Sequence, residues 1–541
     1  MTEKYILIHD LGTSSNKAVI FTLYGRLVAE ARHDYSVHYP KPNYAEQDPY
    51  DWLHAIYDST HKAMEIAGIG SDQIAGITFS CQMQTLVAVD AEGTPVMPAI
   101  SWLDTRGREI LYDKLWTRPR IIGYQPLRLL RFLRVTGGAP GHTGKDPIAK
   151  IIWLKEKRPD LYAKTAKFLD VKDFVIYHLA GTWCKSVDLA VVWWLLDTRK
   201  NRNQWDEKLC RLAGIDPELL PPALSSAAIV GTLQEEAARL MGLKPGIPII
   251  NGSGDIPAAA VGSGALHEGE LSIRLGTSGG ISGHFSRRKI DVTHYAGCIG
   301  STYPEKYYLA LAHQETIGIC LEWLANRILY YKQRLSEETL FKDVYQLLDH
   351  LAAQAPPGAA GLIFTPWMFG ERCPIDDHNV RAGLFNLSLQ HGREHIIRAV
   401  LEGIAFNLRW GLEVLEKLYQ PVDHLHIIGG GAKSDIWCQI IADITNRTIC
   451  QADNPQQANA RGAALLASLS LGYIKSFEDI SDHVVIRQRY TPDPNNRRLY
   501  DHLFKEFKKL YRQNKNWYAR MNGETGWALT HRSAQPEPCL F

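Results

Sequence analysis

The sequence lacks the features that mark several large classes of protein. Its nine cysteines form no Cys-x-x-Cys pair, which argues against a disulfide framework and a structural zinc site. The longest apolar run, Leu189 to Leu196, is far shorter than a membrane span. The first residues lead into a strand without the apolar core of a signal peptide. We therefore expect a reducing, cytoplasmic location and no membrane partner.

An excess of one charge is also missing. Lys and Arg number 60 against 58 for Asp and Glu, so no bulk electrostatic attraction favours a nucleic-acid partner. Apolar residues make up 45% of the chain and charged residues 22%, as in a soluble globular protein. A chain of 541 residues is too long for one core, which predicts two large domains or two and a tail.

Neither common phosphate-binding loop is present. The most glycine-rich point is Gly429-Gly430-Gly431-Ala432-Lys433, where both the Walker A spacing and Gly-x-Gly-x-x-Gly fail. These glycines follow a strand predicted over 424–428, and Ser434 is placed to cap a helix over 435–444. A flat group such as adenosine could lie on this backbone. A glycine run alone is weak support for that interpretation.

What the sequence does contain begins with a diagnostic order of elements. Residues 5–9, 18–21 and 26–31 are predicted strands, 49–67 is a predicted helix with one apolar side, and 74–79 is a further strand. Three meandering strands, a helix and a strand do not open a Rossmann fold. This is the opening order of the actin-like ATPases, an architecture that sugar kinases share.

The turn after the first strand has the chemistry of a phosphate cradle. Gly12 allows close approach of the backbone, and Lys17 adds a positive charge. Asp10 could hold a hydrated magnesium ion. Hydroxyl and amide donors come from Thr13, Ser14 and Ser15. A plain hairpin turn uses the same residue types, so this turn alone leaves both interpretations open.

The second half repeats this turn. A strand predicted over 271–275 leads into Gly276-Thr277-Ser278-Gly279-Gly280, and residues 281–285 return, so Leu-Gly-Thr-Ser occurs once in each half. Such a repeat indicates duplication of one folding unit, with two phosphate turns facing each other across a cleft. Two facing turns are more specific than one.

Between the halves, Asn251 to Pro257 forms a predicted strand-to-helix elbow. An apolar strand at 247–250 precedes two glycines that allow a sharp turn, and Pro257 is placed as the first helical residue. Asp255 would then lie beside the positive end of the helix dipole, which favours the ionised carboxylate and suits a general base. The alternative is that Asp255 only caps the helix.

Two polar loops follow strand-like runs in the first half, where open α/β folds bind ligands. Their amide, carboxylate and guanidinium groups suit sugar hydroxyls, and an indole packs on the face of a sugar ring. Ordinary loop polarity with a tryptophan at the edge of the core is the alternative. The side chains are Gln82, Met83 and Gln84 in one loop, and Trp102, Asp104 and Arg106 in the other.

The C-terminal part carries two further helical patterns. The helix predicted over 456–471 has small residues, among them Gly462, that permit close packing. From about Pro492 a basic amphipathic helix follows, whose charges indicate a solvated face rather than a binding patch. After Asn522 the periodicity is lost, and partial disorder is expected.

Taken together, these residues resemble the FGGY family of carbohydrate kinases from about Tyr5 to about Pro494. The resemblance implies an α/β fold of two ribonuclease H-like domains, as in actin-like ATPases and sugar kinases, around a central cleft. The implied units are an N-terminal sugar-side domain (1–250), a C-terminal nucleotide-side domain (251–490) and a helix with a tail (491–541). The matching segments, in family order, are 10–15, 254–255, 276–279, 370–374, 381–385, the helix at 396–407, and 429–432.

The resemblance also implies an ATP-dependent and Mg²⁺-dependent phosphotransferase that moves the γ-phosphoryl group to a hydroxyl of a small sugar. Asp255 would be the general base, and Asp10 would support the metal. The implied ATP-binding residues are Gly12, Thr13, Ser14, Ser15, Lys17, Gly276, Thr277, Ser278, Gly429, Gly430, Gly431, Ala432 and Lys433. The implied sugar-binding residues are Gln82, Met83, Gln84, Trp102, Asp104, Arg106, Asp255 and Ile256.

Within the family the sequence looks most like xylulokinases, which implies a ketopentose such as xylulose as substrate. It departs from them at Gln84, where they usually carry His, and at Ile256, where they usually carry Asn. The Arg-Glu pair of glycerol kinases is missing at 82–84, which disfavours glycerol. The alternatives are a kinase for another sugar, polyol or aldonate, an actin-like chaperone, and a non-catalytic sugar- or nucleotide-binding regulator; a homodimer is one option for assembly.

Overall fold

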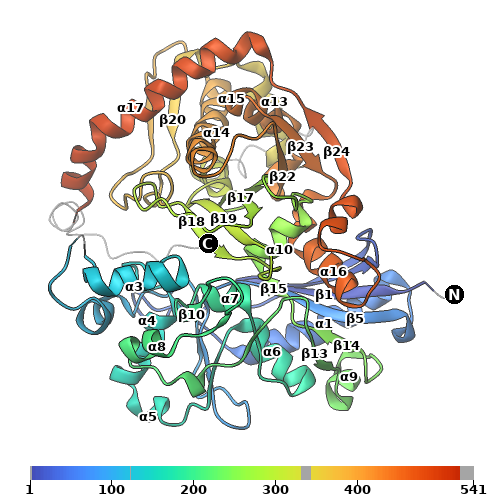
Figure 1. The fold of residues 1–541 in the computed structure, drawn as a ribbon. Coiled ribbons are helices and arrows are strands. Elements are labelled where there is room, and N and C mark those ends of the chain that lie inside the picture. Colours follow the sequence, from blue (N-terminus) through green and yellow to red (C-terminus); the bar gives the residue numbers. More distant parts are fainter. Residues whose placement is uncertain (1–2, 122, 330–342, 524–541) are drawn as a thin grey trace.

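A computed structural model describes residues 3–121, 123–329 and 343–523, and Figure 1 shows them as two α/β halves with α10 and α16 between them. The predicted tail after Asn522 lies almost wholly outside the described residues. The sheet of the N-terminal half has the order β13-β14-β5-β1-β2-β3, and that of the C-terminal half β18-β19-β17-β16-β22-β23-β24.

The strands of the first sheet are β1 (Tyr5–Leu11), β2 (Ser15–Thr22), β3 (Leu27–Asp34), β5 (Ile74–Cys81), β13 (Ile229–Thr232), β14 (Pro248–Ile250) and the short β15 (Ser253–Gly254), which pairs with β5. Those of the second are β16 (Leu271–Leu275), β17 (Gly279–Phe285), β18 (Gly297–Gly300), β19 (Tyr308–Gln314), β22 (His424–Ile428), β23 (Thr448–Ala452) and β24 (Ile486–Tyr490). Two-stranded pairs join β4 (Glu46–Gln47) to β7 (Ala99–Ile100), β6 (Val87–Val89) to β8 (Lys167–Leu169), β9 (Lys185–Ser186) to β12 (Ala223–Leu224), β10 (Leu196–Asp197) to β11 (Gln204–Trp205), and β20 (Ile363–Thr365) to β21 (Gly383–Phe385).

The helices of the N-terminal half include α1 (Pro49–Ala67), α3 (Pro126–Thr136), α4 (Pro147–Lys157), α6 (Val171–Ala180), α7 (Val187–Val191), α8 (Glu207–Ala213) and α9 (Glu235–Met241). They are followed by α10 (Asp255–Gly262), α11 (Gly318–Trp323), α13 (Val344–Gln354), α14 (Arg393–Leu418), α15 (Asp435–Thr445), α16 (Ala458–Ser470) and α17 (Arg497–Asn522).

The two sheets repeat one arrangement of strands. In the first, β1 is antiparallel to β2 and parallel to β5; in the second, β16 is antiparallel to β17 and parallel to β22. Each sheet then adds a parallel strand, β14 or β23, and an antiparallel one, β13 or β24. The repeat predicted from the two Leu-Gly-Thr-Ser turns is confirmed.

Local sequence signals set the limits of several helices. In α1, Pro49 occupies the first turn, Asp48 accepts a hydrogen bond from the Tyr50 amide, and Gly68 ends the helix in the left-handed region at φ 63°. Helix α15 is capped by Ser434, whose hydroxyl accepts a hydrogen bond from the Trp437 amide, as predicted. The predicted helix at 396–407 is longer than expected and forms α14.

The elbow differs in detail from the prediction. Gly254 is the N-cap of α10 and Asp255 is its first residue, so Asp255 does not occupy the N-cap position that the alternative gave it. Pro257 is the third helical residue rather than the first. Asp255 nevertheless lies at the N-terminus of the helix, directly after β15, where the sequence placed it.

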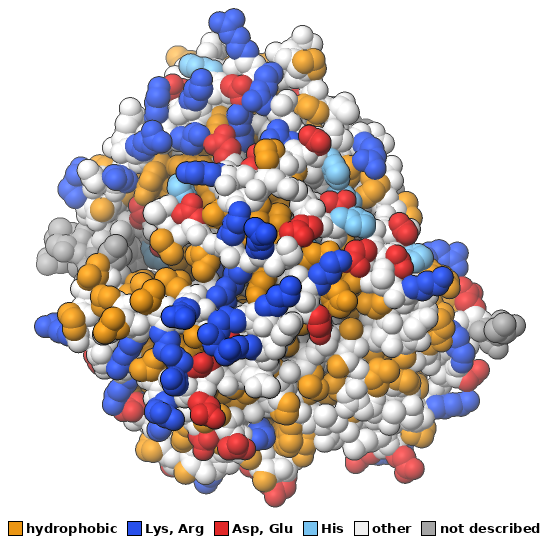
Figure 2. All heavy atoms as spheres, viewed as in Figure 1, with side chains coloured by type: hydrophobic (Ala, Val, Ile, Leu, Met, Phe, Trp, Pro, Cys, Tyr) orange, Lys and Arg blue, Asp and Glu red, His pale blue; other side chains and the backbone are white. Residues whose placement is uncertain are grey.

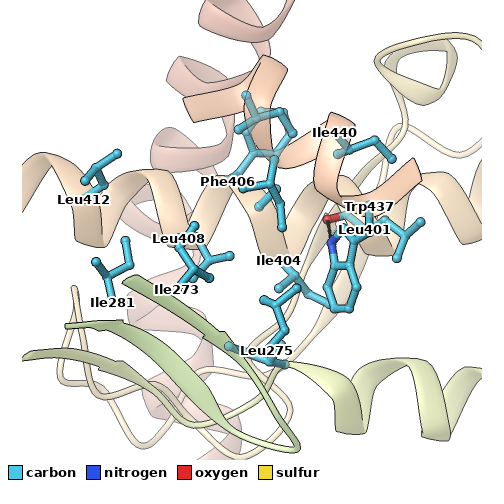
Figure 3. Close-up of a cluster of buried hydrophobic side chains, with 14 of the residues drawn as sticks. Ile273, Leu275, Ile281, Leu401, Ile404, Phe406, Leu408, Leu412, Trp437 and Ile440 are labelled. Atoms are coloured by element: carbon cyan, nitrogen blue, oxygen red, sulfur yellow. Dashed lines mark hydrogen bonds between the residues drawn. The ribbon is translucent and has the colours of Figure 1, made fainter. Parts of the chain in front are cut away.

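The core of the C-terminal half shows why α14 is apolar along most of one side. Figure 3 shows Ile404 and Leu408 of this helix on the side of β16, and Leu401 beside Trp437. The indole of Trp437 donates to the Leu401 carbonyl oxygen at 3.2 Å, which ties α15 to α14. This packing fixes the sheet that carries the second phosphate turn.

Two helices cross between the sheets. Helix α16 packs against Ile6, Ile8 and Ile250 of the N-terminal sheet, whereas α10 contributes to the cluster that contains Ile428 and Ala452 of the C-terminal sheet. Helix α16 also contributes Leu465 and Leu466 to that second cluster, so the two helices pack between the sheets and join the two halves.

Two general features of the molecule concern the apolar character of its helices and the distribution of its surface charges. Across 3–121, 123–329 and 343–523, no helix has the length and apolar character needed to cross a membrane. Figure 2 shows Lys and Arg side chains gathered across the middle of one face, near the level at which the halves meet.

Candidate active site

Three parallel strands of the N-terminal sheet end side by side. Cys81 at the end of β5 pairs with Leu11 of β1 on one side and with Gly254 of β15 on the other. The next residues are Gln82, Gly12 and Asp255. The register therefore brings the predicted base, the first phosphate turn and the predicted sugar loop to the same edge of the sheet.

Two carboxylates lie near each other at this edge. Asp255 is about 30% exposed; its Oδ1 accepts from the Ile256 amide at 2.9 Å, and its Oδ2 lies 3.1 Å from Nη1 of Arg274. Burial raises the pKa of Asp10, Lys17 at 3.9 Å opposes this, and the charge of Asp255 raises it further. Asp10 and Asp255 are thus close enough to interact, each with a cation beside it.

The elbow itself is held from beneath by Asp188 of α7. Its buried carboxylate accepts from the Ser253 hydroxyl at 2.6 Å and the Gly254 amide at 2.7 Å, and from the Ser226 hydroxyl at 2.8 Å. A Cβ on Gly254 would lie 2.8 Å from Sδ of Met83. Gly254 therefore lets Met83 lie directly over the residue before the predicted base.

A fully buried charge network fixes the start of the elbow. Lys172 donates to Asn251 Oδ1 at 2.8 Å and pairs with Asp173 at 3.0 Å. Lys185 pairs with Asp173 and, at 4.0 Å, with Asp170, and it lies 3.9 Å from the centre of the Trp193 ring. Because every charge in it is paired, this network anchors Asn251 at a tolerable cost of burial.

The first phosphate turn is shorter than predicted. The predicted strands ended at residue 9 and resumed at residue 18, whereas β1 runs to Leu11 and β2 starts at Ser15. Its amides are ordered by a bond from the Gly12 N–H to the Ser15 carbonyl at 2.9 Å. Ser14 is exposed and Thr13 half-buried, whereas Ser15 is buried in the strand.

Side chains from the sugar loops reach this turn directly. The Trp102 indole donates to Thr13 Oγ1 at 2.9 Å. Gln47 donates to the Thr13 carbonyl, and Gln82 donates to Gln47 Oε1, both at 2.9 Å. The Oε1 atom of Gln82 is buried without a hydrogen-bond partner among the described residues, which is the condition of a group that awaits a ligand hydroxyl.

Lys150 joins the two sugar loops. Its fully buried Nζ donates to the Gln84 carbonyl at 2.7 Å and to the Ser101 carbonyl at 2.8 Å. Burial lowers the pKa of Lys150 to about 7. The Gln84 side chain donates to Asp146 Oδ1 at 2.9 Å, and its backbone has a positive φ of 66°.

Asp104 and Arg106 lie beneath their loop. The two side chains are buried and joined at 2.7 Å, Arg106 also pairs with Glu46, and the Ala45 amide donates to Asp104 Oδ2. The Arg106 guanidinium stacks on the Tyr44 ring at 3.7 Å. They tie their loop to the segment at 44–46, and their direct contact with a sugar stays a prediction.

The second phosphate turn adjoins the glycine-rich loop. The Gly318 amide donates to the Gly276 carbonyl at 2.9 Å, and the Ile317 amide to the Thr277 carbonyl at 3.0 Å. Gly429 has φ 96°, and a Cβ there would lie 2.5 Å from the Leu275 carbonyl oxygen. The parallel pairing of β16 and β22 thus places Gly276–Ser278 beside Gly429–Lys433, with Gly430 and Lys433 exposed and Ala432 buried.

A charged cluster from the C-terminal half faces the sugar loops. Arg372 pairs with Glu315 at 2.7 Å; although burial would raise the pKa of Glu315, Arg372 holds it at about 2. The Lys145 ammonium lies 5.6 Å from the Trp102 ring centre and forms no salt bridge with a described residue. Burial lowers the pKa of Lys145, and the charges of Glu315 and Asp146 oppose this, so the ammonium lies within reach of acidic groups without being tied to one of them in an ion pair.

Glu371 joins segment 370–374 to the helix that contains residues 396–407. One of its oxygens accepts from the amides of Glu315 and Arg372, and the other from Asn407 Nδ2 at 2.7 Å. Burial raises the pKa of Glu371 to about 8. Glu371 therefore orders the Glu315–Arg372 pair from within the core.

Sequence reasoning missed several of these residues. Asp188 lies directly before the apolar run Leu189 to Leu196, and Lys172 and Lys185 carried no local signal. Arg274 could have been found, because it precedes the second phosphate turn at the position that Asp10 occupies before the first.

The chain has two repeated α/β domains, and these bring together two glycine turns, a glycine-rich loop and an acidic elbow. This combination defines the class of two-domain sugar kinases. Family models agree: the N-terminal domain of the FGGY family of carbohydrate kinases matches residues 5–262, and its C-terminal domain matches 271–471. The chain belongs to this family. It is a phosphotransferase with an alcohol group as acceptor, and the predicted two-domain α/β fold is confirmed.

Known relatives carry more than one substrate name. The chain is 30% identical to the xylulose kinase of Bacillus subtilis over 95% of its length and 98% of the relative, and 28% identical to the gluconokinase of the same species over 98% and 99%. Gluconate kinase and ligand-bound xylulose kinase structures from Lactobacillus acidophilus both match with a TM-score of 0.83 and 26% identity, over 96% of this chain and 100% and 99% of theirs.

Proposed function

We propose that this protein transfers the γ-phosphoryl group of ATP to a hydroxyl of a small sugar or sugar derivative. The observation that carries the proposal is the position of Asp255, which follows β15 at the strand ends where Gly12 and Gln82 also lie. A carboxylate there can accept the hydroxyl proton as the hydroxyl oxygen bonds to phosphorus.

The residues divide between the two substrates. The turn at 12–15 with Lys17, the turn at 276–278 and the loop at 429–433 supply amides, hydroxyls and cations for ATP. Gln82, Met83, Gln84, Trp102 and Ile256 line the sugar side, with Asp104 and Arg106 behind them. Phosphoryl transfer depends mainly on positioning and neutralisation of charge, and this inventory supports both.

Magnesium fits the donors present. The described residues hold no cluster of three or more His, Cys, Asp or Glu that would form a complete metal cage. Mg²⁺ usually takes only one or two carboxylates and completes its shell with water and substrate phosphates. Asp10, with Asp255 nearby, offers such carboxylates, and the ion would neutralise phosphate charge when bound.

The first substrate candidate is a ketopentose such as xylulose. The orphan Oε1 of Gln82 and the neutral Gln84 amide suit sugar hydroxyls. The second candidate is an aldonate. It is favoured by Lys145, whose ammonium lies 5.6 Å from the Trp102 ring centre and forms no salt bridge with a described residue, so that it could pair with a sugar carboxylate.

The proposal is tested by release of ADP from Mg-ATP over a panel of ketoses, pentitols, aldonates and glycerol. The expected result is turnover that depends on one class of acceptor. Lys145→Met separates the two candidates, because it would abolish turnover of an aldonate and leave that of a neutral ketose nearly unchanged. ADP release that is independent of every acceptor would refute the proposed kinase.

A further inference from the structure

The internal repeat places an arginine where the first half has an acid. Ile8-His9-Asp10-Leu11-Gly12-Thr13-Ser14 aligns with Ser272-Ile273-Arg274-Leu275-Gly276-Thr277-Ser278, so Arg274 is the structural counterpart of Asp10. Each lies in the first strand of its sheet, two residues before the glycine of the phosphate turn. The two side chains thus occupy matching positions, with opposite charge.

Both side chains interact with Asp255. Arg274 Nη1 lies 3.1 Å from Asp255 Oδ2, while the charge of Asp255 acts on Asp10. Among the described residues, Asp255 is the only hydrogen-bond acceptor of the Arg274 side chain, and a guanidinium has five N–H donors. The group is about 20% exposed, so its remaining donors are not sealed in the core.

The sheet leaves room beside this guanidinium. Arg274 pairs with Gly280 of β17, and Gly280 pairs with His313 of β19, so a residue without a side chain separates the two in one row. Burial lowers the pKa of His313 to about 3, which leaves a neutral imidazole there. Of the three paired residues Arg274, Gly280 and His313, Arg274 is therefore the one that carries a positive charge. It contacts Asp255 and lies two residues before the turn at 276–278.

On the basis of the proposed function, we propose that Arg274 is a further catalytic residue that binds the phosphoryl group in transit. The acceptor hydroxyl oxygen bonds to the γ-phosphorus as the bond from this phosphorus to the β,γ-bridging oxygen breaks. The electron pair leaves on ADP, and the hydroxyl proton passes to Asp255. Arg274 donates to the equatorial phosphoryl oxygens and offsets the repulsion between them and the Asp255 carboxylate.

Kinetics of Arg274→Met and Arg274→Lys test this role. We expect Arg274→Met to lower kcat about 10³-fold, the scale of a phosphoryl-binding arginine, with the KM for the sugar changed less than about threefold. Arg274→Lys should recover part of the rate, since lysine keeps the charge but not the forked donors. The matched control is Arg32→Met, which removes an exposed arginine of β3 and should leave turnover unchanged. Turnover of Arg274→Met near the wild-type value, or a loss confined to KM, would overturn the proposal.

A second measurement does not require the sugar to be known. ADP with aluminium fluoride presents a planar anion like the phosphoryl group in transit, and calorimetry follows its binding. We expect Arg274→Met to bind ADP like the wild type but to lose at least about 100-fold in affinity for the fluoride complex. Equal affinity of both proteins for that complex would overturn this inference alone. Failure of the wild type to bind ADP would instead overturn the proposed function.

Discussion

Gly462 of α16 lies against the backbone of α10 beside Gly262: a Cβ on Gly462 would overlap the Ala258 carbonyl oxygen and lie 2.7 Å from the Gly262 nitrogen. No flexible side chain could move aside to relieve this contact. Since the two helices pack between the sheets of the two halves, the close contact of Gly262 and Gly462 sets how near the helices lie to each other. The approach of the two phosphate turns depends on it.

Gly462→Ala should therefore destabilise the protein. Overpacking of a tight core contact costs about 1–3 kcal/mol, and here the clash is with backbone. Urea denaturation would measure the change. The matched control is Gly297→Ala, where the nearest atom to a new Cβ is 4.0 Å away, and we expect little change. Equal stability of Gly462→Ala and the wild type would contradict the assigned role of the crossing.

The crossing of α10 and α16 could be predicted only in part from the sequence. Small residues in 456–471 predicted close packing, but not which helix would approach, because the partner lies in another part of the chain. The order of the first elements along the chain and the helix at 49–67 were predictable, since proline, capping residues and apolar spacing act over a few residues. The repeated turn indicated the overall architecture for the same reason.

Lys150→Met should weaken sugar binding. Two carbonyls, of Gln84 and Ser101, would lose their donor, at about 1–3 kcal/mol for each buried group left unsatisfied. We expect the KM for the sugar to rise about tenfold or more, with little change in the KM for ATP. Lys155→Met, on the same helix but at the surface, is the control. A change in the KM for ATP alone would contradict the assignment of Lys150 to the sugar loops.

Lys150 should also change how the free energy of unfolding depends on pH. Burial lowers the pKa of Lys150 from its ordinary 10.5 to about 7, with Asp104 and Asp170 opposing only in part. Between these values the unfolded chain binds a proton that the folded protein does not, so the contribution to the unfolding free energy rises with pH. The difference in stability between wild type and Lys150→Met should grow in favour of the wild type from about pH 7 to about pH 9. A difference that shrinks over this range would show the opposite sign.

Asp188→Ala should impair catalysis without weakening nucleotide binding. It removes the acceptor of the Ser253 hydroxyl and the Gly254 amide, next to Asp255. A shift of about 1 Å in a reacting group costs on the order of 10²-fold in rate, so we expect a fall in kcat of that size. Asp188→Asn should lose less, because its amide oxygen still accepts two bonds. Asp216→Ala, at an exposed helix cap, is the control.

Asp188 also shows what limits prediction of the site. It lies in an apolar segment, and its partners Ser226, Ser253 and Gly254 are distant in the sequence. Burial and pairing of Asp104 with Arg106 were equally hidden, because the spacing of polar residues in a loop does not say which side faces inward. Local pattern predicts which segments carry polar residues after strands; tertiary packing decides which side chains contact a ligand.

The most direct test of the account is formation of sugar phosphate by the wild type and by Asp255→Asn, measured by phosphorus NMR with Mg-ATP and the acceptor identified from the panel. Asn keeps the shape of the side chain but does not accept the hydroxyl proton. The account predicts a rate about 10²- to 10⁴-fold lower in the variant, with ADP affinity unchanged. Sugar phosphate formed at the wild-type rate by Asp255→Asn would contradict it.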